Sequence, residues 1–271
     1  MNLAPPLCRP AFPQLASDQR PPRNAQRQRG GPWRIWITHR VPSAMVVIRW
    51  QASLDTSMVA ARPPDLGTQL LLTKRAALLP ILRRTPADAF LRPTVCTGWT
   101  VRDVLAHCGA ALMRLAEDTL HKFTPELNEL DVAERRSRPL TRVLAELEQG
   151  YAAAAPVLTA TGAKLDGIAL GEWVHGGDVR DALGEPGAYE SDGVKDALVL
   201  LVERSRRQAV PATLVRLPDR ELRLGVGEDT TWVAELVTDV ATLVRLCSGR
   251  APDPARFWLD GADPAHYQLF R

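Results

Sequence analysis

Long apolar runs, paired cysteines and lysine are all scarce in this sequence of 271 residues. The four cysteines are scattered and form no CxxC pair, which argues against a disulfide scaffold or a thiolate zinc knuckle and fits a reducing cytoplasm. The longest apolar runs, such as Ala197–Val202, fall far short of the roughly 20 residues that a membrane span needs. Only four lysines stand beside 30 arginines. We therefore expect a cytoplasmic protein that does not act at a membrane.

The excess positive charge lies entirely in the first 57 residues. The formal net charge of +3 would by itself favour a polyanion as partner. Residues 1–57 hold eight arginines and two aspartates, a net charge of +6, and the remaining 26 basic and 29 acidic residues give the body −3. We therefore expect neither nucleic acid nor a membrane as a partner.

The same segment, 1–57, contains eight prolines and has no lysine, no glutamate and no periodicity of helix or strand. It cannot bury enough apolar surface to offset the entropy lost on ordering. The segment does not fit three functional alternatives. A basic nucleic-acid arm would need a folded basic face beside it, and a transit peptide would be amphipathic and poorer in proline. A secretory signal needs a longer apolar core than Ala44–Ile48, which has five residues. We expect a disordered leader or a start codon assigned too early, with Met45 and Met58 as internal starts.

The body is predicted to begin with a bundle of helices. The five expected helices are Leu66–Arg84, Thr100 to about Phe123, Pro139–Thr161, Leu165–Leu183 and Ser191–Gln208. Pro80 should bend or end the first helix, because an interior proline costs about 3 kcal/mol. Thr100 and Asp103 have the spacing of a capping box, which predicts where the second helix starts.

After Pro211 the pattern changes to short strands. The expected elements are a hairpin of Thr213–Leu217 and Glu221–Leu224, a strand Trp232–Val237, a helix Asp239–Cys247 and a strand Arg256–Leu259. The fold class is therefore α+β. The predicted domains are the leader 1–57, a helical bundle 58–208 and a small mixed α/β domain 209–271.

Two histidines lie on predicted helices among groups that bind metals. His107 lies at the flank of the apolar stripe of its helix and should point toward the bundle interior. Glu172, His175 and Asp178 are spaced three apart, so they share one helix face. If the bundle brings His107 opposite Glu172 and His175, two imidazoles and one carboxylate form the ligand set of an open zinc site. Asp178 could instead fix the tautomer of a histidine.

The spacing also fits a purely structural pair of helices. In that interpretation a neighbour satisfies the interior histidine, and Glu172 and His175 form a surface pair. Cys108 is expected to fill the core rather than act as a nucleophile. Trp99 and Trp173 are expected to be packing anchors without a catalytic role.

Two segments resemble the mycothiol-dependent maleylpyruvate isomerase family. Gly98–His107 is similar to the signature of the family's second helix, and Leu170–Gly184 to its other metal-binding segment, in the same order and about 65 residues apart. Asp239–Arg250 is similar to the sterol-carrier-like domain that closes such proteins. The resemblance covers roughly Met58 to the C-terminus.

The resemblance implies a DinB-like four-helix bundle around a divalent metal, usually zinc, followed by a sterol-carrier-like domain. The matching ligands are His107, Glu172 and His175. Family members more often place the glutamate four residues before the second histidine, whereas here the separation is three. Glu172 is therefore the weakest match, and Asp178 is the obvious substitute.

The implied activity acts on a small-molecule substrate with mycothiol as a thiol cosubstrate. A metal with an open position favours a bound thiolate, which could add to an activated cis double bond, permit rotation and leave the trans product. Other relatives would transfer the thiol to an electrophile. Arg250 could bind a substrate carboxylate, or it could be a surface arginine after a glycine cap. The competing hypotheses are a non-catalytic small-molecule-binding protein and a member that has lost its metal.

Overall fold

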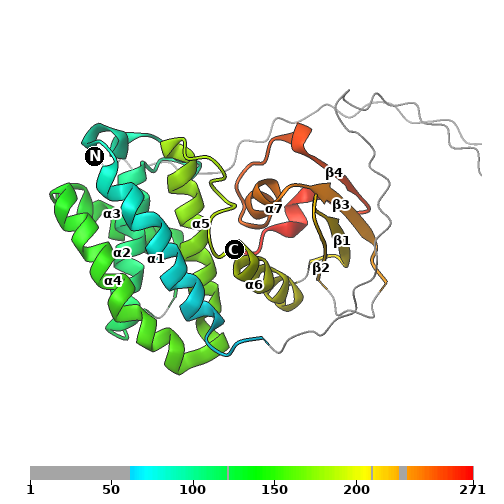
Figure 1. Cartoon of the computed structure of the whole chain (residues 1–271), viewed down its shortest axis with the longest axis horizontal. Coiled ribbons are helices and arrows are strands. Elements are labelled where there is room, and N and C mark those ends of the chain that lie inside the picture. Colours follow the sequence, from blue (N-terminus) through cyan, green and yellow to red (C-terminus); the bar gives the residue numbers. More distant parts are fainter. Residues whose placement is uncertain (1–61, 121, 209, 226–230, 271) are drawn as a thin grey trace, which may run out of the picture. The chain divides into compact units, whose positions relative to one another are not determined.

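The computed structural model describes residues 62–120, 122–208, 210–225 and 231–270, and the expectations for residues 1–57 lie outside this range. Within it, seven α-helices and four short strands give an α+β fold (Figure 1). None of the described helices combines the length and the apolar character that a membrane crossing needs.

The helical part of the described chain has six helices (Figure 1). The six are α1 (Leu66–Arg84), α2 (Val101–Ala116), α3 (Pro125–Arg136), α4 (Leu140–Thr161), α5 (Asp166–Leu183) and α6 (Val194–Arg207). Of these, α1, α2, α4 and α5 form the bundle, and α3 and α6 lie against it. α2 packs mainly on α4, and α1 packs on α5 and α4; α3 lies against α2 and α6 against α5. The five predicted helices are confirmed, whereas α3 was not predicted because its only buried apolar side chain is Val132.

Two predicted helix ends differ from the structure. α2 ends at Ala116 rather than near Phe123, and Asp118, two residues beyond, adopts the left-handed conformation with φ of 57° that ends a helix. α1 continues through Pro80 to Arg84, so the helix does not end at the proline. The buried side chains Leu78, Leu79, Ile81 and Leu82 flank Pro80, and their packing offsets the lost backbone hydrogen bond.

The predicted capping box at the start of α2 is confirmed. The backbone N–H of Asp103 donates to Thr100 Oγ1 at 3.3 Å, and the N–H of Thr100 donates to Asp103 Oδ2 at 3.0 Å. This reciprocal pair fixes the first turn of α2 and therefore the rotation of the whole helix. That rotation places His107 on the buried side of α2.

The C-terminal part is a four-stranded mixed sheet in the order β2-β1-β3-β4. Its strands are β1 (Thr213–Arg216), β2 (Glu221–Leu224), β3 (Ala234–Thr238) and β4 (Phe257–Asp260), and α7 (Val240–Cys247) follows β3. β1 and β2 form the predicted antiparallel hairpin, β1 runs parallel to β3, and β3 pairs antiparallel with β4. Every element predicted after Pro211 is confirmed in type.

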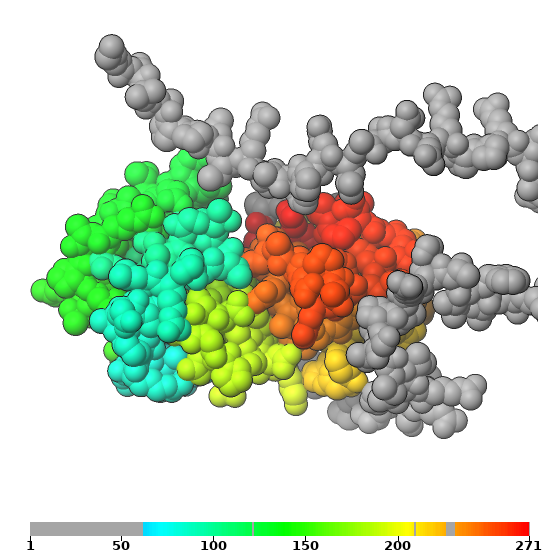
Figure 2. Space-filling model, turned by 90° about the horizontal axis from the view of Figure 1, so that it is seen from above, coloured from blue at the N-terminus to red at the C-terminus, as the bar shows by residue number. Residues whose placement is uncertain are grey.

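Two buried clusters meet at α5. One fills the bundle around Leu105, Leu147 and Tyr151, and the other joins Trp173 of α5 to α6, α7 and the sheet, where Leu243 is fully buried. In the space-filling view the yellow-green residues of α5 lie against orange residues of the C-terminal part (Figure 2), in agreement with the ion pair between Asp181 and Arg245. α5 is therefore covered on both sides, and it carries most of the candidate site.

Candidate metal and substrate site

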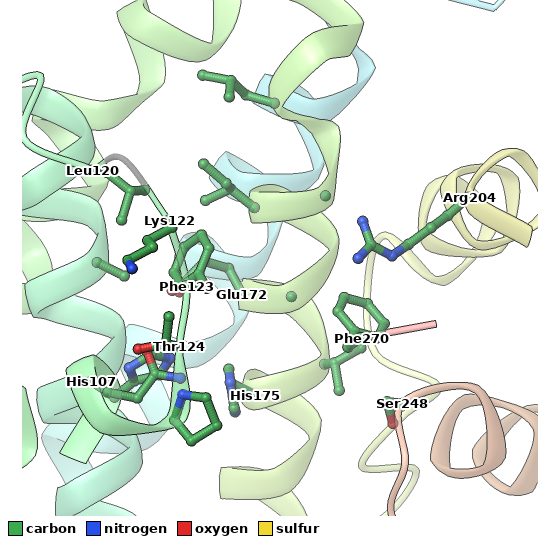
Figure 3. Close-up of a pocket in the computed structure, with 18 of the residues that line it drawn as sticks. His107, Leu120, Lys122, Phe123, Thr124, Glu172, His175, Arg204, Ser248 and Phe270 are labelled. Atoms are coloured by element: carbon green, nitrogen blue, oxygen red, sulfur yellow. The ribbon is translucent and has the colours of Figure 1, made fainter. Parts of the chain in front are cut away.

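The bundle brings the two predicted histidines together. The rings of His107 on α2 and His175 on α5 lie 5.2 Å apart between centroids, at an interplanar angle of 77°. Trp99 also packs near His107, with a distance of 5.1 Å between the ring centroids. The meeting of α2 and α5, which the spacing alone left open, is thus a feature of the fold. Figure 3 shows both imidazoles at one cavity, with Glu172 close by.

His107 has a buried nitrogen without a partner. Its side chain is only 6% exposed, and Nδ1 has no hydrogen-bond partner among the described residues. Burial and, to a smaller extent, the neighbouring His175, Lys74 and Arg250 lower the pKa of His107 to about 3. The ring is therefore neutral near pH 7, which is the form in which imidazole binds a metal.

Asp178 is the hydrogen-bonding centre of the site and is fully buried. It accepts hydrogen bonds from four side chains: Tyr189 Oη at 2.7 Å, Arg250 Nε at 3.0 Å, His175 Nδ1 at 3.0 Å and Cys96 Sγ at 3.3 Å. Burial raises the pKa of Asp178, but the hydrogen bonds and charges of His175 and Arg250 outweigh it and hold the pKa well below its usual range. Because a carboxylate only accepts, Nδ1 of His175 donates this hydrogen bond, which in a neutral imidazole leaves the lone pair on Nε2.

Arg250 follows Gly249 after α7 and reaches α5 from the C-terminal part. Its side chain is 12% exposed and forms an ion pair with Asp178, so the alternative of a surface arginine is wrong. Arg250 also lines the cavity that contains the two histidines. Burial lowers its pKa, but the neighbouring Asp178 raises it more, so the guanidinium stays charged.

Glu172 is buried and forms an ion pair with Lys74, whose Nζ lies 2.6 Å from Glu172 Oε2. The alternative of a surface pair between Glu172 and His175 is therefore wrong. Nζ of Lys74 also lies 5.0 Å from the ring centroid of Tyr151. Burial lowers the pKa of Lys74, but Glu172 and, to a smaller extent, Tyr151 and Cys108 raise it above its usual range, so the ammonium of Lys74 stays charged.

The two adjacent glycines of α5 make room for these partners. A Cβ on Gly177 would lie 2.3 Å from Cδ1 of Tyr189, the residue whose hydroxyl reaches Asp178. A Cβ on Gly176 would lie 3.1 Å from Cε of Lys74, the residue that reaches Glu172. The glycines therefore let two side chains approach the helix backbone closely enough to hold its carboxylates.

Cys96 joins the site from the loop before α2, although the sequence gave no sign of it. Its Sγ donates to Asp178 Oδ2 at 3.3 Å and lies 3.9 Å from His175 Nδ1. Ligand-type atoms of Cys96, His175 and Asp178 all lie within 4.8 Å of one another. Burial and Asp178 raise the pKa of Cys96 to about 12, against the opposing effect of Arg250, so the thiol stays protonated. Cys108 lies in the bundle core, where a core filler was expected.

The cavity has a volume of about 580 Å³, within the range typical of small-molecule sites. His107, Glu172, His175 and Arg250 line one region of it. The apolar side chains of its wall are Ala111, Leu120, Phe123, Leu165, Ile168, Val174 and Phe270, and further basic side chains are Lys122, Lys164, Arg204 and Arg207. Of the residues singled out from the sequence, His107, Glu172, His175 and Arg250 therefore face one cavity, whereas Asp178, the substitute ligand, is not among its lining residues.

Comparisons with known proteins agree with the resemblance. Residues 71–183 match the family model of the mycothiol maleylpyruvate isomerase N-terminal domain. The structure is similar to the crystal structure of the mycothiol-dependent maleylpyruvate isomerase, with 14% identity, a TM-score of 0.50 and coverage of 74% of this chain and 95% of that one. The crystal structure of a histidine-to-alanine mutant of the enzyme gives 15% identity, a TM-score of 0.49 and the same coverage.

No curated protein matches the chain. The matched segment runs from α1 to the end of α5 and contains the first predicted signature and all of the second except Gly184. Residues 71–183, which carry His107, Glu172 and His175, are therefore similar to the mycothiol maleylpyruvate isomerase N-terminal domain, over less than half of the chain.

Proposed function

We propose that this protein is a metal-dependent enzyme of the maleylpyruvate isomerase type, which uses mycothiol on a small electrophilic substrate in the cytoplasm. The observation that carries the proposal is the meeting of His107 and His175 at a cavity of about 580 Å³. The domain family supports the reaction class, and the scattered cysteines support a reducing compartment. The chemistry is either cis–trans isomerisation or transfer of the thiol.

The donor types of these residues fit a divalent metal such as zinc, although the three potential ligands whose atoms come within 4.8 Å of one another among the described residues are Cys96, His175 and Asp178. Nδ1 of His107 is buried and has no hydrogen-bond partner in the part of the chain that the structure describes, a state that costs free energy unless a ligand satisfies it. His175 keeps Nε2 as a lone pair, because Nδ1 is engaged with Asp178. Glu172 can retain Lys74 on one carboxylate oxygen and offer the other. We therefore propose His107, Glu172 and His175 as the ligands, with zinc as the metal.

The other residues of the site act through these three. Asp178 fixes the tautomer and the orientation of His175, which is the task of a carboxylate next to a ligand imidazole. Arg250 and Tyr189 hold Asp178 in its ionised form. We therefore propose Arg250 as a positioning residue of the site, because both Nε and Nη2 of its guanidinium donate to Asp178.

When bound, the metal would lower the pKa of a thiol and so provide the nucleophilic thiolate at neutral pH. The protein's own contribution is to position and enclose the reactants. The apolar side chains of Leu120 and Phe123 line the cavity on the side of the loop that follows α2. Such walls exclude water from an electrophilic substrate and from the reacting sulfur.

The ligand assignment is tested by metal analysis of protein purified without chelator. The unmodified protein should retain about one divalent ion per chain, and His107→Ala and His175→Ala should each lose it while circular dichroism shows an unchanged helix content. His266→Ala is the matched control, because His266 lies in an exposed turn away from the cavity. Retention of the metal by either test variant would contradict the assignment.

The activity is tested by turnover. The metal-loaded protein should isomerise an activated cis double bond, or consume an electrophile, only when mycothiol is present. Chelation should abolish the turnover, and restoring the metal should recover it. Saturable binding of small molecules without any turnover, in a protein that retains no metal, would favour the alternative of a non-catalytic binding protein.

A further inference from the structure

The cavity has a basic end whose cations lack acidic partners inside it. Among the described residues of its lining, Glu172 is the only acidic one, and Lys74 already neutralises it. Arg250, the arginine that the sequence offered for a substrate carboxylate, is engaged with Asp178. Among the described residues, Arg204 and Arg207 at the end of α6 form no ion pair, yet both line the cavity.

The guanidinium of Arg204 is held in place from three sides. Nε donates to the backbone carbonyl of Leu269 at 2.8 Å, and the group lies 4.6 Å from the ring centroid of Phe270. On its third side it touches α5 at Gly167, where a Cβ would lie only 2.7 Å from Nη1. Figure 3 shows Arg204 extending from α6 toward α5 beside Phe270. An arginine fixed in this way loses little further freedom when it binds a ligand.

Among the described residues no acid forms an ion pair with Arg204. Its neighbour Arg207 acts, however, on the carboxyl of Asp166: burial raises the pKa of this carboxyl, and the charges of Arg62 and Arg207 oppose the rise. The acids next to this end of the cavity are Asp166 and Glu203, and both form ion pairs with Arg62. Burial lowers the pKa of Arg204, and the positive charge of Arg207 lowers it further. A half-buried guanidinium beside a second one is stabilised by any anion that reaches both.

The ligand chemistry follows from the rest of the wall. A planar guanidinium with free Nη groups matches the two oxygens of a carboxylate. Phe123, Ile168 and Phe270 offer apolar surface in the same cavity. We propose that Arg204, assisted by Arg207, binds the carboxylate of a substrate whose apolar body lies along this wall. The inference rests on the proposed function and names the substrate class for the same cavity: an organic carboxylate with an apolar body.

Binding of a matched pair of probes tests the inference without turnover. The probes are 4-phenylbutyrate and its uncharged amide, 4-phenylbutanamide, titrated by calorimetry into chelator-treated and metal-loaded protein. The carboxylate should bind at least tenfold more tightly than the amide, a difference of about 1.4 kcal/mol. The preference should be present in both metal states, because Arg204 is not a ligand in the proposed site.

Two variants separate the arginine's role from the stability of the fold. Arg204→Met should weaken binding of the carboxylate at least tenfold and leave the amide unchanged, and Arg204→Lys should recover part of the affinity. Gly167→Ala changes no charge but displaces Nη1, the flexible end of the side chain, so it should weaken carboxylate binding with little change in the midpoint of thermal unfolding. Lys195→Met is the charge-matched control, because Lys195 is exposed on α6 and does not line the cavity.

Equal affinity for the two probes would overturn the inference, as would unchanged carboxylate binding in both Arg204→Met and Gly167→Ala. The proposed function fails on a different readout. Loss of the metal from the unmodified protein would refute the metal enzyme and leave carboxylate binding by Arg204 intact. If the protein retains its metal but binds the carboxylate and the amide equally, only the role of Arg204 is refuted.

Discussion

The ammonium of Lys74 lies 2.6 Å from Glu172 Oε2 in the interior of the bundle, and both side chains are less than 5% exposed. Lys74 comes from α1 and Glu172 from α5, so the pair joins the first and last helices of the bundle. A buried pair of this kind is costly to break, since the remaining partner keeps an uncompensated charge away from water. The conformation of a proposed ligand is therefore set by a helix that contributes no ligand itself.

Lys74→Met should lower the free energy of unfolding by about 3–5 kcal/mol, because it leaves the carboxylate of Glu172 buried and unpaired. Urea denaturation followed by circular dichroism measures the change. The double variant Lys74→Met, Glu172→Gln should recover much of the loss. Arg83→Met, which removes an exposed pair with Glu148, is the control and should cost less than about 1 kcal/mol. A loss for Lys74→Met as small as this control would contradict the role given to the buried pair.

Asp178→Asn should weaken metal binding by about 10–100-fold, because His175 loses the carboxylate that fixes its tautomer. Titration with a competing chelator measures the affinity. Tyr189→Phe is the comparison: it removes one hydrogen bond to Asp178 and should cost about 1 kcal/mol of stability while the metal affinity changes little. Equal metal affinity in Asp178→Asn and the unmodified protein would show that Asp178 does not position the ligand.

Gly177→Ala should destabilise the fold by about 1–3 kcal/mol, since its Cβ would overlap the ring of Tyr189 at 2.3 Å. Gly171→Ala on the same helix is the matched substitution. Its Cβ would meet Phe270 at an ordinary 3.8 Å, so the gain in helix propensity should leave stability unchanged or raise it by up to about 1 kcal/mol. Thermal and urea unfolding should therefore separate the two variants, and similar midpoints would refute the close packing at Gly177.

Asp239 should make stability depend on pH in the acid range. Its carboxylate accepts from the N–H of Thr242 at 2.8 Å and from Arg256 Nε at 3.0 Å. Burial raises the pKa of Asp239, but these donors outweigh it and lower the pKa below the ordinary 3.8. Because the folded-state pKa is depressed, the stabilisation is complete above the unfolded value and is lost as pH falls through the folded one.

The measurement is the difference in unfolding free energy between the unmodified protein and Asp239→Asn, which keeps a capping side chain without the charge. This difference should be constant from pH 5 to pH 7, where an ordinary aspartate is ionised in both the folded and the unfolded state. It should shrink toward zero below about pH 3, where the carboxyl becomes protonated. A difference that stays constant down to pH 2 would show that the cap owes nothing to its charge.

Local signals in the sequence were sufficient to predict most of the fold. The capping box of Thr100 and Asp103 located the start of α2, and the turn at Pro218–Arg220 located the hairpin. These signals work because the interacting groups are only a few residues apart. α3 escaped prediction because it is a polar helix with little apolar periodicity, although Thr124 caps its first turn and Pro125 occupies it.

The site was predictable only where its residues share a helix. Glu172, His175 and Asp178 were recognised from their spacing on α5, and their partners Lys74, Tyr189 and Cys96 were not. Those partners come from segments whose approach depends on tertiary packing. The two glycines at 176 and 177 were the one local sign that side chains approach the backbone there, but they do not identify which ones.

The ion pair between Asp178 and Arg250 joins positions 72 residues apart, one in the helical part and one in the part that contains the sheet. Replacing either half alone would remove one partner of this ion pair and leave the other partner's charge buried and unpaired in the remaining half. The two halves are therefore expected to melt in a single cooperative transition. An exchange of C-terminal parts between relatives would succeed only where the incoming sequence supplies a cation at this position.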